Sequence, residues 1–133
     1  MGFENISMLA VLAAAVAKFA LGGLWYSSLL FGRTWMNELR LRETDLDNPR
    51  FALIVAAIVS IIAALAMAVI IDIAGLPLLG CLILGLVIGI GVSAANLSLQ
   101  FAFEGRSFRL YMIYAGQYLC EAVLMAGIIG YFQ

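Results

Sequence analysis

Two ionisable residues lie inside long apolar stretches of this 133-residue chain, so they are the first candidates for chemistry. Lys18, the only lysine, lies near the middle of the first apolar run, and Glu121 lies near the middle of the last. An ionised side chain at the centre of a bilayer costs about 2.5–3.5 kcal/mol on insertion scales, so such groups usually find a partner. We therefore predict that Lys18 and Glu121 form a pair, either ionised or neutral with one shared proton.

The last apolar run carries a row of polar side chains on the helix face that holds this carboxylate. Residues three and four positions apart are neighbours on a helix surface, so positions i, i+3, i+4 and i+7 share one face. The residues at these positions are Tyr114, Gln117, Tyr118 and Glu121. We predict that this row and Lys18 belong to one ligand-binding or proton-binding site.

The preceding apolar run carries a second polar row, formed by Ser93, Asn96 and Gln100. In an α-helix this row shares a face with Gly85 and Gly89, which match the close-approach glycine pattern of membrane helices. If the two polar rows face each other, they line a cavity that opens toward the cytoplasm and ends at the ion pair. Polar groups of this kind can instead hydrogen-bond between helices, with a contribution of about 0.6 kcal/mol each.

The rest of the composition argues against several classes of function. The chain has no histidine, which is the commonest metal ligand and the usual proton shuttle near neutral pH. No metal-binding cluster, phosphate-binding loop or hydrolytic set of residues is recognisable, so we expect no catalytic residues, no metal and no cofactor. The formal net charge of -1 gives no overall attraction to nucleic acid.

The composition indicates an integral membrane protein. Hydrophobic residues make up 65% of the chain and charged residues 11%, against about 45–50% and 25% in soluble domains. Four apolar runs, at about 6–30, 51–73, 76–103 and 108–132, each exceed the roughly 20 residues that a helix needs to cross a bilayer. Helices satisfy their own backbone groups in lipid. We predict an all-α bundle of four transmembrane helices that forms a single membrane domain over residues 1–133.

The basic residues predict how the bundle is oriented. The second connection and both ends of the chain carry no Lys or Arg side chain, whereas the first and third connections and their borders carry Arg33, Arg40, Arg42, Arg50, Arg106 and Arg109. The positive-inside rule therefore predicts a multi-pass protein of the cytoplasmic (inner) membrane with both termini outside. At about 1.5 Å per residue, Lys18 and Glu121 then lie at nearly equal depth, roughly 17 Å from the outer surface.

The first connection is the long polar one. Within it, residues 34–42 predict a short interfacial helix whose apolar side chains, Trp35 among them, face lipid. Trp25, Tyr26 and Trp35 are predicted to be aromatic anchors at the membrane interface.

Small side chains predict where helices pack closely. The second run has such a residue at every fourth position, and we assign this row to packing: Ala52, Ala56, Ser60, Ala64 and Ala68. The two cysteines, Cys81 and Cys120, differ in predicted depth too much for a disulfide, and we expect two buried free thiols.

Two stretches of the sequence resemble a known family. Residues 22–36 read GGLWYSSLLFGRTWM and residues 103–116 read FEGRSFRLYMIYAG. Together they resemble domain-of-unknown-function family 1761, a group of small bacterial membrane proteins, although the family usually has proline where this chain has Ser28. The resemblance implies four spans over nearly the whole chain, and it implies no activity and no site residues.

Two functions are consistent with these observations. The first is a membrane protein that binds or transports a small solute or proton through the polar cavity that ends at Lys18 and Glu121. The second is a non-transporting scaffold or accessory subunit in which the two residues form a structural ion pair. Four helices make a thin wall around any pathway, so we expect a homo-oligomer of two or more subunits in the lipid bilayer.

Overall fold

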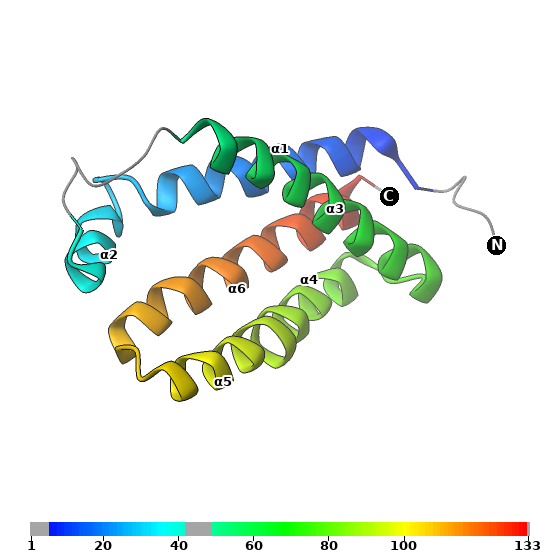
Figure 1. Cartoon of the computed structure of the whole chain (residues 1–133). Helices are drawn as coiled ribbons and strands as arrows, with labels where there is room; N and C mark the ends of the chain where they lie inside the picture. The colour runs from blue at the N-terminus through cyan, green and yellow to red at the C-terminus, as the bar shows by residue number, and fades with distance from the viewer. Residues whose placement is uncertain (1–5, 42–48, 133) are drawn as a thin grey trace.

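The computed structural model describes residues 6–41 and 49–132, and every regular element in these ranges is a helix (Figure 1). Four stretches are long and apolar enough to cross a membrane: Met8–Trp25, Arg50–Ala74, Leu78–Glu104 and Phe108–Tyr131. The chain is therefore a multi-pass membrane protein with four spanning helices, as the hydropathy pattern predicts. In chain order, the elements are α1 (Met8–Trp25), α2 (Gly32–Leu39), α3 (Arg50–Ala74), α4 (Leu78–Leu86), η3 (Val87–Ala94), α5 (Ala95–Glu104) and α6 (Phe108–Tyr131).

Local chemistry sets several of the helix ends. The hydroxyl oxygens of Ser7 and Ser107 each accept a hydrogen bond from the backbone N–H three residues further on, at 3.2 and 3.1 Å. Such caps satisfy N–H groups that have no partner inside the helix. Gly75 and Gly105 end α3 and α5 in the left-handed conformation, which glycine adopts without strain.

The bundle is built around α6 (Figure 1). This helix packs against α1 on one side and against α4 and η3 on another, while α3 packs mainly on α1. Gly85 and Gly89 allow the third span to approach closely: a Cβ atom at these positions would lie 2.7 Å from the Cα of Val123 and 2.8 Å from the Cα of Leu119. Glycine-mediated packing is confirmed here, and α6 is the partner.

A π-helical segment, η3, interrupts the third span. Its i→i+5 hydrogen bonds put more residues into each turn than an α-helix has, so α-helical counting fails across it. Beyond η3 the inward face is displaced by one position. Phe101 is buried, whereas Asn96 and Gln100 are exposed at the surface of the bundle. The prediction that Asn96 and Gln100 face the last span is wrong for this reason.

The first membrane helix ends at Trp25, earlier than the predicted end near residue 30. The following residues form a tight turn, in which the N–H of Phe31 donates to the carbonyl of Trp25 at 3.0 Å and the N–H of Gly32 donates to that of Ser27 at 2.9 Å. A Cβ atom at Gly32 would lie 2.7 Å from the Ser27 carbonyl oxygen, so only glycine fits this turn. The turn places α2 against α6.

Side-chain contacts attach α2 to the start of α6. The hydroxyl of Ser107 donates to Glu38 Oε2 at 2.7 Å, and Arg109 Nε lies 3.8 Å from Glu38 Oε1. Trp35 Nε1 donates to the hydroxyl of Tyr114 at 3.0 Å. The prediction that Trp35 faces lipid is therefore wrong, because its indole N–H has a hydrogen-bond acceptor inside the bundle.

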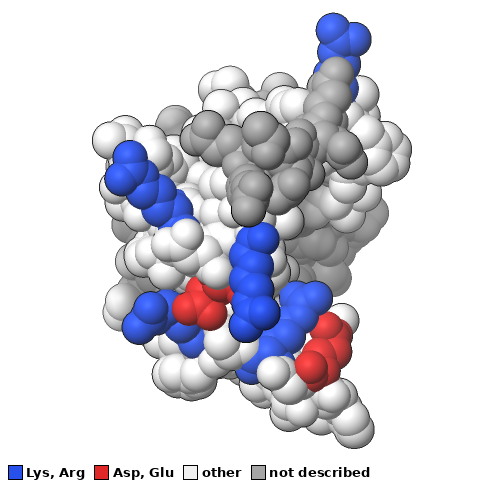
Figure 2. All heavy atoms as spheres, turned by 60° about the vertical axis from the view of Figure 1, so that its left-hand side comes forward, with Lys and Arg blue, Asp and Glu red and all other residues white. Residues whose placement is uncertain are grey.

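Basic side chains gather at one end of the molecule, on α2, the start of α3 and the connection between α5 and α6 (Figure 2). We call it the arginine end. The start of α1 and the end of α6 lie at the opposite end, which we call the termini end (Figure 1). Arg42, which is predicted to lie with these basic residues, lies outside the described residues. The described arginines exposed at this end are Arg33, Arg40, Arg50, Arg106 and Arg109.

The apolar core lies where α1, α3, α4 and α6 meet, toward the termini end. The row of small residues on α3 enters it only in part, since Ser60, Ala64 and Ala68 are buried, Ala56 is half-buried and Ala52 is exposed. The predicted packing row is confirmed toward the termini end, whereas toward the arginine end its residues are half-buried or exposed.

The two thiols differ in their surroundings. Cys81 is buried in the core, as expected, and a Cβ atom at Gly130 would lie 2.8 Å from its sulfur atom. Cys120 is exposed on α6, so the expectation of a buried thiol is wrong at this position. The reason is that α6 presents this position to the outside of the bundle, between the faces that pack against other helices.

Candidate intramembrane binding site

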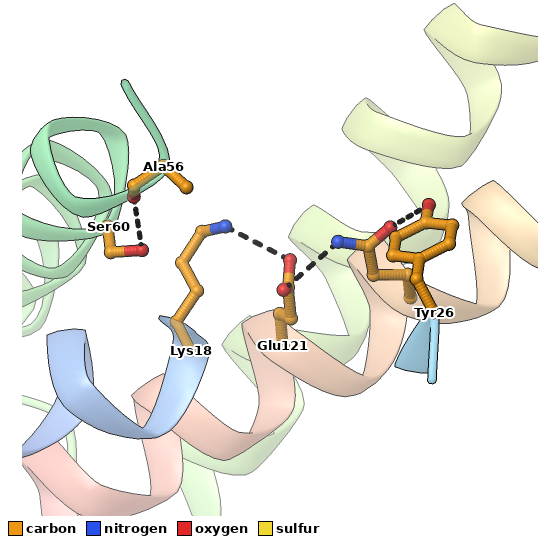
Figure 3. Close-up of polar contacts among 6 residues, drawn as sticks. Lys18, Tyr26, Ala56, Ser60 and Glu121 are labelled. Atoms are coloured by element: carbon orange, nitrogen blue, oxygen red, sulfur yellow. Dashed lines mark hydrogen bonds and ion pairs between the residues drawn. The ribbon is translucent and has the colours of Figure 1, made fainter. Parts of the chain in front are cut away.

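Lys18 of α1 and Glu121 of α6 form an ion pair (Figure 3). The Lys18 Nζ atom lies 3.1 Å from Glu121 Oε1 and donates a hydrogen bond to it. The Glu121 side chain is 4% exposed and that of Lys18 is 17% exposed. The predicted contact is confirmed. Pairing offsets part of the cost of holding charged groups in hydrocarbon.

Small residues of α1 let the two helices approach at this level. Ala14 and Ala15 are buried one turn before Lys18. Gly22 lies one turn after it, where an added Cβ atom would lie 3.4 Å from Glu121 Oε2. The glycine therefore leaves room for the carboxylate directly beside α1.

Gln117 fixes the orientation of the carboxylate. Its Nε2 atom donates to Glu121 Oε2 at 3.2 Å, and its Oε1 atom accepts a hydrogen bond from the hydroxyl of Tyr26. Both oxygens of Glu121 thus have a donor. A polar chain of Lys18, Glu121, Gln117 and Tyr26 leads from the middle of the bundle toward the arginine end (Figure 3).

Aromatic rings fill the arginine end of this chain. The ring of Tyr26 lies edge-on to that of Trp35, with centroids 5.2 Å apart, and 6.2 Å from that of Tyr114. We call these three residues the aromatic plug. Phe101 packs on Tyr114 at 5.8 Å, so the third span supports the plug. Burial raises the pKa of the Tyr26 phenol, and the nearby tyrosines and Glu121 raise it further, so the hydroxyl remains a neutral donor near pH 7.

Two grooves meet at the ion pair, each of about 350 Å³ and each open on one side. The arginine-side groove lies between α1, α3 and α6, and its lining includes Lys18, Gly22, Tyr26, Ala56, Gln117 and Glu121. The termini-side groove lies between α3, η3 and α6, and its lining includes Lys18, Ala63, Met67, Ile88, Glu121 and Met125. Most of the surface of both grooves is apolar.

The cavity therefore has walls that differ from the predicted ones. We predicted it between the last two spans, where Phe101 instead packs on the rings of Tyr111 and Tyr114. The space lies along α3, because this helix leans on α1 and leaves part of α6 uncovered. Of the predicted polar residues, Ser93 and Tyr118 line the termini-side groove and Gln117 lines the arginine-side groove, whereas Tyr114, Asn96 and Gln100 line neither.

Sequence reasoning missed two polar residues of the site. Tyr26 was predicted only as an interfacial anchor, although it follows Lys18 by eight residues, close to two helical turns, and this spacing indicates the same face. Ser60 was assigned only to packing, yet it lines the arginine-side groove beside Lys18 while its hydroxyl donates to the carbonyl of Ala56 at 2.7 Å (Figure 3). The sequence does contain a signal for this role, because Ser60 is the one hydroxyl in a row of alanines.

The predicted anchors also have a different role. Trp25 Nε1 donates to the carbonyl of Ile113 at 2.8 Å, and a Cβ atom at Gly116 would lie 3.1 Å from its ring. Like Tyr26 and Trp35, it turns its polar atom toward α6. The two stretches quoted above, residues 22–36 and 103–116, thus pack against each other and form the arginine end of the bundle.

Comparison with known proteins identifies the family of this chain. The model of a family described as "Protein of unknown function (DUF1761)" matches residues 9–130, nearly the whole chain. The resemblance expected from the sequence is confirmed by this match. No curated protein and no solved structure matches the chain.

Proposed function

The chain belongs to the DUF1761 family of proteins of unknown function, and we propose from the geometry of its ion pair that it binds a small solute inside the membrane. The observation that supports this most is the position of Lys18 and Glu121 at the junction of two open grooves of about 350 Å³ each. A pair that only joins two helices is expected to be enclosed by close packing. Ligand sites typically combine 300–1,000 Å³ of mainly apolar space with a few polar groups.

The free hydrogen-bonding capacity of the pair lies on the lysine. An ammonium group has three N–H donors. Among the described residues, Glu121 Oε1 is the acceptor that Lys18 contacts, and the lysine side chain is 17% exposed to the grooves. Glu121 has both oxygens bonded and is held by Gln117. We assign recognition of the solute to Lys18 and positioning of the lysine to Glu121.

Solute binding is better supported than proton conduction. A proton path along the polar chain would pass through Gln117, whose amide has donors and an acceptor but does not titrate. Transfer of a bound solute along the two grooves, from one membrane half to the other, would extend the same function. The proposal includes no enzymatic step.

The alternative is a structural ion pair in a scaffold or accessory subunit, and the complete bonding of the buried Glu121 favours it. Lys18→Met combined with Glu121→Gln separates the two functions. The protein is extracted together with its native membrane, and native mass spectrometry detects a small molecule retained as a mass adduct. We expect an adduct on the parent protein and on the control Arg109→Gln, and none on the double variant.

Two results of that experiment would contradict the binding proposal. An adduct that survives in the double variant means that the pair does not recognise the solute. A folded parent protein without any adduct means that the grooves hold only bulk lipid, and the structural pair is then the better explanation.

We further propose that the arginine end faces the cytoplasm and that both termini lie outside, in the cytoplasmic membrane of a bacterium. The gathering of exposed arginines at one end supports this orientation under the positive-inside rule (Figure 2). A C-terminal fusion to alkaline phosphatase, which is active only outside the cytoplasm, should be active. A cytoplasmic C-terminus, seen as an inactive phosphatase and a fluorescent green-fluorescent-protein fusion, would refute it.

A further inference from the structure

We propose that the solute reaches Lys18 sideways from the hydrocarbon core of the bilayer, and that it is a neutral, mostly apolar molecule with a carbonyl group. This inference rests on the proposed function, since it names the ligand class of the same site. Its support comes from the route into the site, from the lining of the termini-side groove and from the charge of the pair.

The open route lies along α3. The third span and α3 pack on different parts of α6, and the termini-side groove opens between them. Val59, Ile70 and Tyr118 line this groove and are 45%, 40% and 37% exposed, so its rim faces the surroundings of the helices. These residues belong to segments long and apolar enough to cross a membrane, so the proposed route begins in lipid. The arginine-side groove also reaches the pair, but the aromatic plug borders it at Tyr26.

The lining of the termini-side groove suits a carbon chain. Polar groups occur at the junction with the pair and at Ser93 and Tyr118, and the remaining lining is aliphatic or thioether. The apolar lining residues are Val59, Ala63, Ala66, Met67, Ile70, Ile88, Ala122 and Met125. A molecule already dissolved in the membrane gains little when its apolar tail enters this groove, because lipid is equally apolar. The polar head must therefore supply the selectivity.

The charge of the site favours a neutral head with a hydrogen-bond acceptor. The charge of Lys18 is already compensated by Glu121 at 3.1 Å, so an additional anion would be an unpaired charge inside the membrane, where charges are costly. A carbonyl oxygen can accept one of the remaining N–H donors of Lys18 without adding charge. The site is thus complementary to a carbonyl-bearing lipid.

The proposal is tested with a benzophenone that carries a ten-carbon chain, because its ketone is both the acceptor and the photoreactive group. The full-length protein in phosphatidylcholine nanodiscs is irradiated with this probe, and labelled residues are mapped by mass spectrometry. We expect labelling at Met67 and Met125, which line the termini-side groove. A ten-carbon alkyl benzoquinone should compete with the probe, whereas the matched diphenylmethane without a ketone and palmitate should not.

Two variants test the binding site at the ion pair and the entry route through the termini-side groove separately. Lys18→Met with Glu121→Gln removes the charged donor and keeps the site neutral. The introduced amide is an uncharged and weaker donor, so labelling should fall about tenfold to a hundredfold, as expected for a lost hydrogen bond to a charged group. Ala66→Phe leaves the pair intact and fills the groove from an exposed position of α3, so it should also reduce labelling. Ala52→Phe, an exposed alanine in the other groove, is the matched control and should leave labelling at Met67 unchanged.

Each failure has its own signature. If the double variant is labelled like the parent, the pair recognises nothing and the proposed function fails together with this inference. If the double variant loses labelling while Ala66→Phe does not, the pair is a binding site but the termini-side groove is not the route. Competition by palmitate and not by the quinone would show that the head is an anion, which overturns the proposed ligand class.

Discussion

Replacing Lys18 with methionine should destabilise the protein more than replacing Glu121 with glutamine. Methionine fills the space of the lysine stem but leaves a carboxylate that is 4% exposed without its cation. Removing one partner of a buried ion pair costs about 3–5 kcal/mol, and the surviving hydrogen bond from Gln117 places the expected cost near 3 kcal/mol. Glutamine at position 121 keeps an oxygen that can accept the hydrogen bond from the Lys18 ammonium, so the expected cost is about 1–2 kcal/mol.

The double variant shows whether the costs of the two single variants arise from the interaction between Lys18 and Glu121. Without either charge, no group is left unpaired, and the expected destabilisation is about 1–2 kcal/mol from altered packing and the changed bond to Gln117. The costs of the two single variants then sum to about 4–5 kcal/mol. Subtracting the cost of the double variant leaves a coupling energy of about 2–4 kcal/mol, which overlaps the range of about 0.5–3 kcal/mol for residues in direct contact.

The assay is reversible unfolding in mixed micelles of increasing dodecyl sulfate content, followed by circular dichroism. Arg109→Met is the matched control, because it also removes a cation but from a side chain that is 73% exposed, and a change within about 0.5 kcal/mol is expected. If the two single costs add to the cost of the double variant within about 0.5 kcal/mol, Lys18 and Glu121 do not interact and the reasoning is refuted.

Two further predictions use the same unfolding assay. Gly89→Ala should cost about 1–3 kcal/mol, because the new Cβ atom would lie 2.8 Å from the Leu119 backbone. Gly91→Ala is the control and should be neutral or slightly stabilising, because no atom lies within 4 Å of the new Cβ atom. Equal effects of the two substitutions would contradict the close approach of the third span to α6. Tyr26→Phe should cost about 0.5–1.5 kcal/mol by removing the hydrogen bond to Gln117, and unchanged stability would show that this bond contributes nothing.

The sequence was sufficient to predict the four spans and the contact between Lys18 and Glu121. Both predictions follow from the bilayer, which sets the length of a spanning helix and penalises an unpaired charge. Counting residues from the ends of two antiparallel helices placed the two groups at one depth. These arguments do not depend on side-chain detail.

The walls of the cavity were not predictable in the same way. The π-helical segment η3 displaces Asn96 and Gln100 from the face that α-helical spacing assigns to them, and a run of glycine, valine and isoleucine does not indicate where such a segment begins. The tilt of α3 is equally hidden, because its small residues would permit close packing along the whole helix but are buried only toward the termini end.

The aromatic residues show a third kind of error. Tryptophan and tyrosine near the end of a span are commonly interfacial anchors, which is how Trp25, Tyr26 and Trp35 were interpreted. Here α1 packs on α6 and the turn at Gly32 places α2 against α6, so all three polar atoms reach acceptors on α6. The expected homo-oligomer stays a prediction, which crosslinking in native membranes would test.

The most direct test of the proposed site uses the fact that the chain has one lysine. Protein labelled with ¹⁵N at the lysine side chain gives a single Nζ signal in solid-state NMR of lipid bilayers. We predict dipolar contact between this nitrogen and the Glu121 carboxyl carbon, and a shift of the signal when the alkyl benzophenone is added in the dark but not when the diphenylmethane analogue is added. A Nζ signal without contact to Glu121, or one that neither compound shifts, would contradict a ligand site at the ion pair.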